Sequence, residues 1–249
     1  MMSVIIKKEQ MKKIIISGGL GDFSRAFCSI APKKDFTTFP LSKHEMNITD
    51  ISQVHDAIER INPDYFIHAA ATTRPMEKHE KYPGLSILNN IIGTANVVMA
   101  CMTRNIKLVY LSTDHVYPGH SGNYSEEDPV MPVNNYAWSK LGGECSVKLY
   151  NNSCILRLAM VKNPFPHKFA IVDSYKSSLF IEDAAKISLY LLDKFGTYNV
   201  GGDRMSIYDF AKIKNPSVKK IFLREIKNVK MPRDVSMNLE KMKITLKND

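Results

Sequence analysis

Three side chains in the middle of the chain could together move a proton to or from a carbonyl oxygen: Thr113, Tyr136 and Lys140. Tyr136 and Lys140 are four residues apart, which places them on one face of a helix. Because a nearby ammonium favours the ionised phenol, we expect Lys140 to lower the pKa of Tyr136 from its usual value of about 10. Such a phenol can act as a general acid or base. Thr113 would hold the carbonyl oxygen that receives the proton.

The surrounding sequence predicts the elements that position these three residues. The apolar run at 107–112, KLVYLS, is typical of a buried strand that ends next to Thr113. A polar loop rich in Gly, Pro and acidic residues follows, and then a helix that carries Tyr136 and Lys140. A Tyr and a Lys at this spacing are common, so the interpretation also depends on the strand end, on the loop and on a glycine turn near the N-terminus.

The glycine turn is predicted to bind a dinucleotide. Residues 14–16 form a β-branched run, as in a strand buried on both faces, and the sequence SGGLGDFS at 17–24 leads into a helix. Gly18 permits a tight turn, and Gly21 lets the backbone approach a pyrophosphate at the helix N-terminus. The pattern is G-x-x-G-x-x-S, which has Ser24 where a third small residue is expected.

The end of the second predicted strand, 36–41, bears on the choice of dinucleotide. An acidic residue there would bind the ribose hydroxyl of NAD, but Ser42 and Lys43 follow instead. A basic residue suits the 2′-phosphate of NADP, so the sequence favours NADP and leaves NAD as an alternative.

The polar sequence NITD at 47–50 caps the next helix and would lie beside the adenine. The strand at 64–71 ends in three alanines, across which a cofactor could lie. His68, inside that strand, is interpreted as a core histidine.

Composition and charge limit the classes of function. The chain has 249 residues and 44% hydrophobic residues, which fits one α/β domain with or without a small second lobe. No apolar run approaches the ~20 residues that span a bilayer, and the first ten residues lack the features of a signal peptide. We therefore expect a cytoplasmic protein without a membrane partner.

Met11 resembles a natural start, so residues 1–10 would be an N-terminal extension. The four cysteines are widely spaced, so we expect free thiols and no metal site.

Much of the net charge of +9 lies late in the chain. Residues 212–249 contain eleven Lys or Arg and four Asp or Glu, a difference of +7. No nucleic-acid recognition motif accompanies them. A solvated basic face and a groove for an anionic small molecule both fit this pattern. The Pro-containing segment 161–176 is predicted to be an irregular loop that covers a substrate.

Several motifs together resemble the extended short-chain dehydrogenase/reductases and, within them, the dTDP-4-dehydrorhamnose reductase family. The similarity extends from Ile14 to about Lys243. It rests on GGLGDFS, NITD, HAAA, the Asn90-x-x-Gly93-Thr94 pattern, STDHVYPG, YSEEDP, PVNNYAWSKLGGE and MPRDVSMNLEKMK. The block from STD to the Tyr-x-x-x-Lys pair is the most specific part.

The resemblance implies an α/β fold, a Rossmann-like doubly wound parallel sheet with a small C-terminal substrate-binding lobe. We expect residues 11–160 to form the NAD(P)-binding part and residues 161–249 a lobe interleaved with it. The implied reaction is NADPH-dependent reduction of the 4-keto group of a dTDP- or UDP-linked 4-keto-6-deoxyhexose, as in the last step of activated L-rhamnose synthesis. Thr113 would orient the keto oxygen, Tyr136 would protonate it, and Lys140 would hold the nicotinamide ribose.

The expected binding residues follow from the motifs. Those for the cofactor are Gly18, Gly21, Asp22, Phe23, Ser42, Lys43, Asn47, Ile48, Ala69, Ala70, Ala71, Asn90, Tyr136 and Lys140. Those for the sugar nucleotide are Asp114, His115, Arg157 on the strand at 153–158, and Arg233 as a candidate for the diphosphate. His115 stands where the family more often has Tyr.

Other members of this superfamily remain alternatives. The 4,6-dehydratases carry Thr-Asp-Glu, but His115 replaces the second acid here, and the Cys of epimerase-reductases is missing from the loop. Simple reduction therefore fits best. Met160 replaces a common aromatic residue, and the chain is about fifty residues shorter than common members. These departures leave room for a 4-epimerase with tightly bound NAD, or for a catalytically silent regulatory subunit like the β-subunit of methionine adenosyltransferase. A homodimer is compatible with the sequence, which does not fix the oligomeric state.

Overall fold

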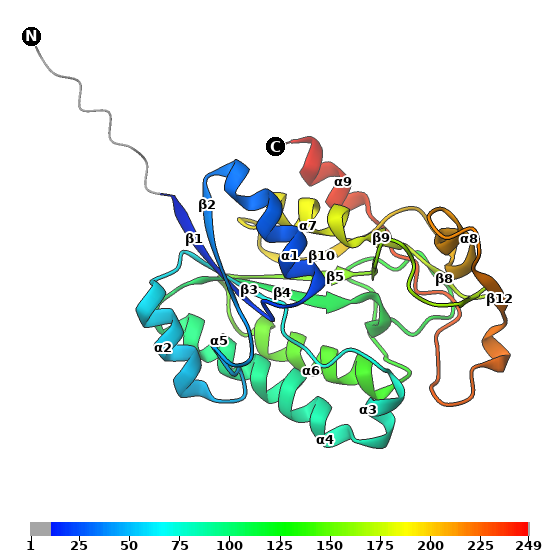
Figure 1. The fold of residues 1–249 in the computed structure, drawn as a ribbon, viewed down its shortest axis with the longest axis horizontal. Coiled ribbons are helices and arrows are strands. Elements are labelled where there is room, and N and C mark those ends of the chain that lie inside the picture. The colour runs from blue at the N-terminus through cyan, green and yellow to red at the C-terminus, as the bar shows by residue number, and fades with distance from the viewer. Residues whose placement is uncertain (1–10, 249) are drawn as a thin grey trace, which may run out of the picture.

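A central parallel sheet forms from the short apolar runs of the sequence. The computed structural model describes residues 11–248, so the expected extension at 1–10 lies outside the described residues. The strands lie in the order β10-β5-β4-β3-β1-β2, and all neighbouring pairs are parallel (Figure 1). Their bounds are β1 Lys12–Ser17, β2 Phe36–Leu41, β3 Tyr65–His68, β4 Lys107–Thr113, β5 Ser153–Leu158 and β10 Gly196–Val200.

Helices cover both faces of the sheet because β1 and its neighbours are apolar on both sides. Ile14 and Ile16 pack into one buried cluster with α1 and α7, whereas Ile15 packs into another with α2, α5 and α6. Figure 1 shows these two helical layers above and below the strands. This arrangement confirms the predicted Rossmann-like doubly wound sheet. The helices of the two layers are α1 Asp22–Ile30, α2 Ile51–Ile61, α5 Gly93–Thr103, α6 Asn135–Lys148, α7 Ile181–Tyr190 and α9 Glu240–Lys247.

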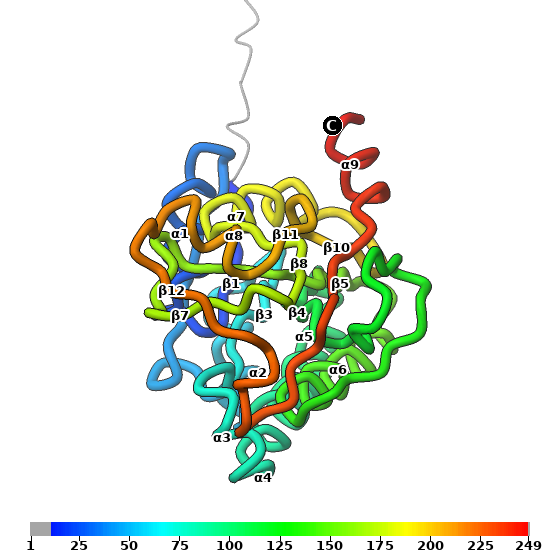
Figure 2. Tube along the Cα trace, turned by 90° about the vertical axis from the view of Figure 1, so that its right-hand side faces the viewer, coloured from blue at the N-terminus to red at the C-terminus, as the bar shows by residue number. Residues whose placement is uncertain are grey.

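A small lobe lies beyond the carboxyl ends of the strands (Figures 1 and 2). It consists of three two-stranded pairings and α8 Ile207–Lys212, which pack around Phe165, Ala170, Ala211 and Val218. The chain leaves this lobe between residues 181 and 200, where α7 and β10 rejoin the main sheet. The pairs are β6 Met160–Val161 with β9 Leu179–Phe180, β7 Phe169–Ile171 with β12 Lys219–Ile221, and β8 Tyr175–Lys176 with β11 Met205–Ser206.

The prediction of an irregular loop at 161–176 was therefore wrong in part. Two short strands, β7 and β8, form there because each finds a partner about 30 to 50 residues later in the chain. The remaining short elements are η1 Ala31–Lys34, α3 Glu77–Lys81, α4 Pro83–Ser86, η2 Ile87–Ile92, η3 Asp114–Val116 and η4 Leu223–Glu225.

The continuous helix α4–η2–α5 corrects the expectation that no apolar run approaches the length needed to span a bilayer. Pro83–Thr103 is 21 residues long with a mean hydropathy of 1.5, so by length and composition it could cross a membrane. Half of its apolar window is buried inside the protein, as in the core helix of a globular domain. It packs against α2 and α6, and Val97, Ala100 and Cys101 are fully buried there.

Candidate active site

A cavity of about 600 Å³ opens at the carboxyl ends of β1, β3, β4 and β5. A neighbouring hollow of about 410 Å³ shares four residues with it, Gly18, Lys43, Ala70 and Ala71, so the two form one elongated groove. The strand order reverses between β1 and β3, and ligands of open α/β sheets bind at such a switch point.

The glycine turn forms one end of this groove. Gly18 has a φ of +75°, and a Cβ there would lie 3.0 Å from the Cα of Ala70, so only glycine fits. Gly21 is the N-cap of α1 and supplies no side-chain hydrogen bond to the first turn. The Ser24 hydroxyl donates to the Gly18 carbonyl at 2.9 Å and closes the turn. Backbone N–H groups at the start of α1 therefore remain available for an anion, and the site fits a dinucleotide pyrophosphate.

Most residues predicted for the cofactor lie along the groove. The main cavity contains Gly18, Gly21, Asp22, Phe23, Ser42, Lys43, Ala69, Ala70, Ala71 and Tyr136, and the smaller hollow contains Asn47 and Ile48. Asp50 caps α2 by accepting from the backbone N–H groups of Ser52 and Gln53, which holds the 47–50 segment at the edge of that hollow. His68 is buried between Ser17 and Thr94 and hydrogen-bonds both, which confirms it as a core histidine.

Asn90 does not line the groove. Its amide exchanges hydrogen bonds of 2.8 and 2.9 Å with the backbone of Thr72 and donates to the Ser139 hydroxyl at 2.8 Å. The side chain is 1% exposed, so these bonds occupy it within the protein. The structure thus gives Asn90 a supporting position, in which it ties the segment after β3 to α6 behind the groove.

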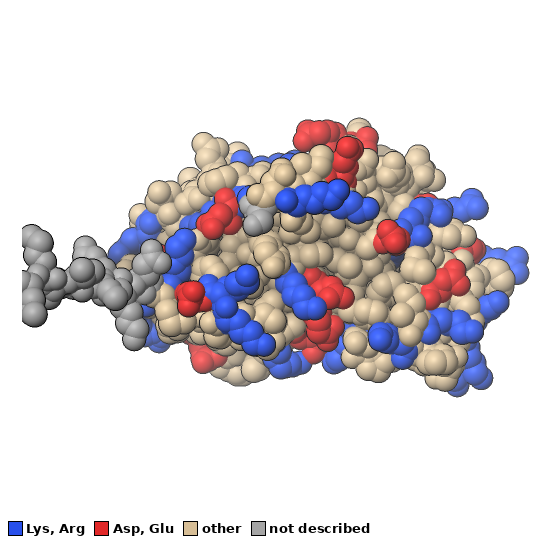
Figure 3. Space-filling model, turned by 90° about the horizontal axis from the view of Figure 1, so that it is seen from above, with Lys and Arg blue, Asp and Glu red and all other residues tan. Residues whose placement is uncertain are grey.

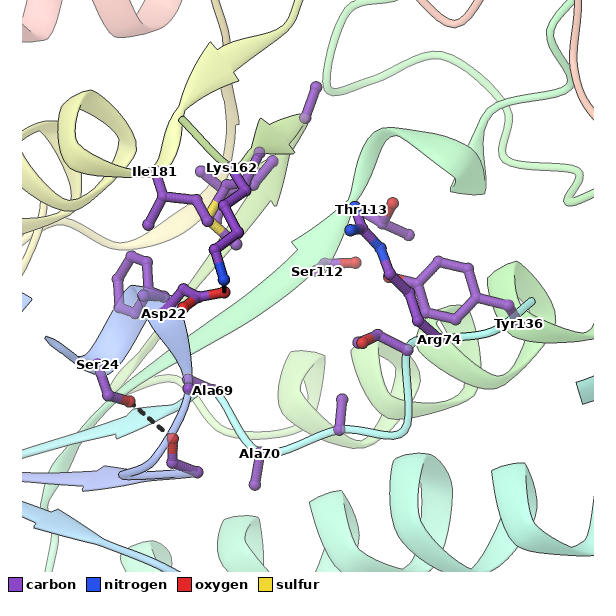
Figure 4. Close-up of a pocket in the computed structure, with 18 of the residues that line it drawn as sticks. Asp22, Ser24, Ala69, Ala70, Arg74, Ser112, Thr113, Tyr136, Lys162 and Ile181 are labelled. Carbon is purple, nitrogen blue, oxygen red and sulfur yellow. Dashed lines mark hydrogen bonds and ion pairs between the residues drawn. The ribbon is translucent and has the colours of Figure 1, made fainter. Parts of the chain in front are cut away.

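Tyr136 and Thr113 meet at the other end of the main cavity (Figure 4). Tyr136 lies in the first turn of α6, where Asn134 caps the helix by accepting from the Ala137 N–H at 2.9 Å. Burial raises the pKa of Tyr136 to about 12, although its hydrogen bond with Thr113 acts in the opposite direction. The phenol is therefore protonated at neutral pH.

Lys140 does not lower the pKa of Tyr136, so that expectation was wrong. Lys140 is 3% exposed, lies outside the cavity wall, and has its Nζ 4.1 Å from the centre of the Tyr110 ring. Burial lowers its own pKa to about 7, so it carries only part of a charge at neutral pH. The cation that lowers the pKa of Tyr136 is Arg74, although burial outweighs it. Figure 4 shows Arg74 beside Tyr136 and Thr113.

Asp114 and His115 line the cavity next to Thr113 and contact a lysine of the small lobe. The Nζ of Lys176 lies 2.9 Å from a carboxylate oxygen of Asp114 and 2.9 Å from Nε2 of His115. The Thr113 hydroxyl donates to Asp114 at 3.1 Å. The Thr113 hydroxyl thus interacts with both Asp114 and Tyr136.

The two predicted arginines lie away from the cavity. Arg157 is 1% exposed; it forms a 2.9 Å ion pair with the fully buried Glu144 and donates to the Tyr117 hydroxyl at 2.9 Å. Its guanidinium is satisfied inside the protein, so it joins β5 to α6 instead of reaching a substrate. Arg233 is exposed and does not line either hollow.

The basic residues of the cavity come from other parts of the chain. Besides Lys43, the cavity is lined by Arg74, Lys162 and Lys176, whereas no residue of 212–248 lines it. Lys162 forms an ion pair of 3.3 Å with Asp22 from the opposite side of the cavity (Figure 4). The lysines and arginines of 212–248 are exposed. Figure 3, which views the molecule from above, shows basic side chains over the small-lobe end, interspersed with acidic ones. The late basic region is thus a solvated face.

These three cations were not predicted from the sequence because no recognisable motif surrounds them. Arg74 follows the alanine run by three residues and could have been noticed there. Lys162 and Lys176 reach the cavity only through the pairing of the small lobe. Within residues 11–248, no group of three His, Cys, Asp or Glu side chains could hold a metal ion.

Comparison with known proteins places the chain in a family. The family described as the RmlD substrate binding domain matches residues 11–172. The chain belongs to this family. A solved dTDP-4-dehydrorhamnose reductase from Bacillus anthracis, in complex with NADP, superposes with a TM-score of 0.86 at 25% identity, over 94% of this chain and 92% of that one. A Clostridium acetobutylicum reductase of the same name, 23% identical over 94% and 92% of the two chains, shares the fold with a TM-score of 0.82. The predicted resemblance is confirmed.

Curated relatives fall into two kinds. The β-subunit of mouse methionine adenosyltransferase 2 is 25% identical over 236 residues, which cover 80% of this chain and 70% of the relative. The dTDP-4-dehydrorhamnose reductase of Mycolicibacterium smegmatis is 32% identical over 140 residues, and the dTDP-4-keto-6-deoxy-D-glucose reductase of Streptomyces niveus is 30% identical over 134 residues. The matches cover 55% and 53% of this chain but only 41% and 46% of the two reductases, so the chain spans less than half of their length.

Proposed function

We propose that the protein reduces the 4-keto group of a nucleoside-diphospho-4-keto-6-deoxyhexose, dTDP- or UDP-linked, with NADPH. The proposed reaction is the last step of activated L-rhamnose synthesis, in the cytoplasm and without a nucleic-acid or membrane partner. The observation that carries the proposal is the shared cavity, in which the phenol of Tyr136 and the glycine turn face the same groove. With the pyrophosphate of the cofactor at the turn, its nicotinamide would extend toward Tyr136 and meet a ketone held at the phenol.

The groove residues support NADPH as the cofactor. The Gly18–Ala70 contact and the uncapped start of α1 would accommodate the pyrophosphate, and Asn47 and Ile48 would border the adenine. Lys43 lines both hollows after β2, where it would meet a 2′-phosphate. The B. anthracis reductase was solved with NADP. NADPH, when bound, would supply a hydride to the keto carbon.

The side chains of this protein would then complete the reaction at oxygen. Tyr136 holds its proton at neutral pH because burial raises its pKa to about 12, so it is in the form that a reduction requires. As negative charge develops on the keto oxygen, Tyr136 would donate that proton as general acid. Arg74 would stabilise the phenolate that remains, since its charge already favours the ionised form. Thr113 would fix the phenol through their hydrogen bond.

The experiment that tests this function is NADPH oxidation with a panel of dTDP- and UDP-linked 4-keto-6-deoxyhexoses. We expect at least one member to be reduced by the purified protein, with the stereochemistry of the new hydroxyl resolved by NMR. NADPH that stays unoxidised with every member, in a protein shown to bind it, would reject the assignment as a reductase.

The second candidate function is a catalytically silent regulatory subunit. The mouse β-subunit aligns over more of this chain than the two curated reductases do, which specifically favours it. As a regulatory subunit, the protein would bind a partner enzyme and change that enzyme's rate. Co-purification from its own source, followed by an assay of the partner with and without this chain, tests it. A partner whose rate changes, together with no reduction of any keto-sugar, would favour it over the reductase.

We also propose that the protein forms a homodimer through the outer side of α4–η2–α5 and the start of α6. Large apolar side chains are roughly half exposed there: Ile87, Leu88, Ile92, Met99, Met102 and Trp138. An apolar patch on a soluble protein commonly marks an interaction surface. Light scattering after gel filtration should give a dimer mass that Met99→Glu reduces to that of a monomer. A monomer for the unmodified chain would contradict the proposal.

A further inference from the structure

Lys176 crosses from the small lobe to the end of β4 and makes two contacts there. One joins its Nζ to Asp114 at 2.9 Å, and the other joins it to Nε2 of His115 at 2.9 Å. Asp114 is 1% exposed and His115 5%, whereas the Lys176 side chain is 17% exposed at the cavity wall. The proton transfer described above does not use this contact between Lys176 and His115.

The chemistry of the two groups decides which nitrogen of His115 carries hydrogen. An ammonium group has only donors, so Nε2 of His115 must accept from Lys176. A neutral imidazole that accepts at Nε2 carries its hydrogen on Nδ1. Asp114 balances the charge of Lys176, and burial together with Lys176 lowers the pKa of His115 to about 4, against the opposing effect of Asp114. His115 is therefore a neutral Nδ1–H donor at physiological pH.

That donor has no partner among the residues that the structure describes. Nδ1 of His115 is buried and makes no hydrogen bond with any residue of 11–248. Leaving such a buried group unsatisfied is costly, and His115 belongs to the cavity wall, with its ring 6.2 Å from that of Tyr136. A molecule bound against Tyr136 would therefore lie beside the ring that carries this unused donor.

We propose that Lys176 is a positioning residue that fixes His115 as the Nδ1–H tautomer, and that His115 thereby donates a hydrogen bond to an uncharged oxygen of the bound sugar. The ligand chemistry is a hydroxyl, ring or carbonyl oxygen, since Nδ1–H can serve only an acceptor. The contact with the sugar rests on the proposed function, whereas the tautomer does not. The small lobe would thus select the substrate through a histidine of the main sheet.

Long-range nitrogen-15 NMR of the imidazole rings tests the tautomer directly, with His115 assigned by the loss of its signals in His115→Phe. Near pH 7 we expect His115 to be neutral with hydrogen on Nδ1. Lys176→Met should abolish the preference for this tautomer, and Lys176→Arg, which keeps the charge and the donors, should retain it. Lys168→Met removes an exposed lysine of the same lobe outside the cavity and should change nothing. An Nε2–H tautomer or an imidazolium in the unmodified protein would overturn the proposal, as would an unchanged tautomer in Lys176→Met.

Steady-state kinetics with the reduced keto-sugar tests the contact. Loss of one neutral hydrogen bond should raise the KM of His115→Phe for the sugar nucleotide about 3–10-fold while the KM for NADPH stays the same. An unchanged KM for the sugar would refute the contact even if the tautomer is confirmed. If no keto-sugar is reduced by the unmodified protein, the proposed function and the sugar contact both fail, whereas the NMR result still decides the role of Lys176.

Discussion

The two ends of the groove present chemically different surfaces. At the turn end, the surface is mostly backbone and small side chains, in which Gly18 touches Ala70 and the first turn of α1 has no side-chain cap. At the Tyr136 end, the surface consists of polar side chains from β4, α6, the segment after β3 and the small lobe. The first end suits a ligand part that many proteins share, and the second suits a ligand part that differs between enzymes.

This difference indicates which end of the groove would determine specificity for the substrate. A backbone cradle forms whenever the strand, turn and helix form, so its chemistry is fixed by local sequence. The Tyr136 end exists only when Arg74, Asp114 and Lys176 are brought together from three separate segments. Substitutions at the two ends should therefore have separable effects, on cofactor binding at one end and on turnover and sugar recognition at the other.

The largest expected effect is that of Tyr136→Phe. Removing the proton donor should lower turnover by about 10²–10⁴-fold, while NADPH binding changes little because the turn is untouched. Turnover of the keto-sugar and fluorescence titration of NADPH measure the two quantities. Tyr190→Phe, at a half-exposed position on α7, is the matched control and should leave both unchanged. Unaltered turnover in Tyr136→Phe would remove Tyr136 from its assigned role.

Gly18→Ala tests the turn end. The added Cβ would lie against Ala70 at a backbone angle that other residues rarely adopt, so the turn must shift. We expect NADPH to bind about 10–100-fold more weakly, since strain of this kind is typically about 1–3 kcal/mol. Gly196→Ala has a similar φ of +80° but meets open space at the start of β10, and it should retain NADPH affinity. Equal losses in both variants would mean that the effect is general instability.

The stability effect of Lys140 is smaller and depends on pH. Burial lowers the pKa of Lys140 to about 7, so above that pH the folded chain binds fewer protons than the unfolded chain, whose lysines ionise normally. Stability due to this group therefore rises with pH from about 7 toward the usual lysine range. Lys140→Met should raise the thermal midpoint more near pH 6 than near pH 8.5, with a difference of about 4–8 °C. Lys148→Met, an exposed lysine on the same helix, should show no such difference. A difference of the opposite sign would mean that Lys140 stays charged in the folded protein.

The smallest effect concerns the choice of dinucleotide. Lys43 is exposed, so its interaction with a 2′-phosphate is screened by solvent, and Lys43→Gln should weaken NADPH binding only about 2–5-fold. NADH binding should not change. Titration of both dinucleotides into both proteins measures this, and a preference of the unmodified protein for NADH would contradict the assignment.

The sequence predicted the turn end well because each part is local. The strand at 36–41, the cap at Asp50 and the alanines after β3 are all encoded within a few residues of where they act. Thr113 and Tyr136 could also be predicted, since a strand end and a helix of known spacing define them. The sheet itself followed from the apolar runs.

The Tyr136 end could not be predicted to the same depth because it depends on burial and on distant pairing. Helical spacing alone placed Lys140 near Tyr136, but desolvation in the folded chain lowers the pKa of the lysine and raises that of the phenol. Arg157 faces a buried acid, Glu144, that only the packing of β5 on α6 brings to it. Lys176 reaches His115 through a lobe whose strands pair across 30 residues of sequence.

The most direct measurement of the central claim is the fate of deuterium from NADPH labelled at the transferable position. The protein is incubated with an accepted dTDP- or UDP-linked 4-keto-6-deoxyhexose, and both products are examined by NMR and mass spectrometry. We expect one deuterium on C4 of the sugar for each NADPH oxidised, with Tyr136→Phe nearly inactive. Label that remains in the dinucleotide, with an epimerised sugar or with no sugar product, would contradict the proposed reduction.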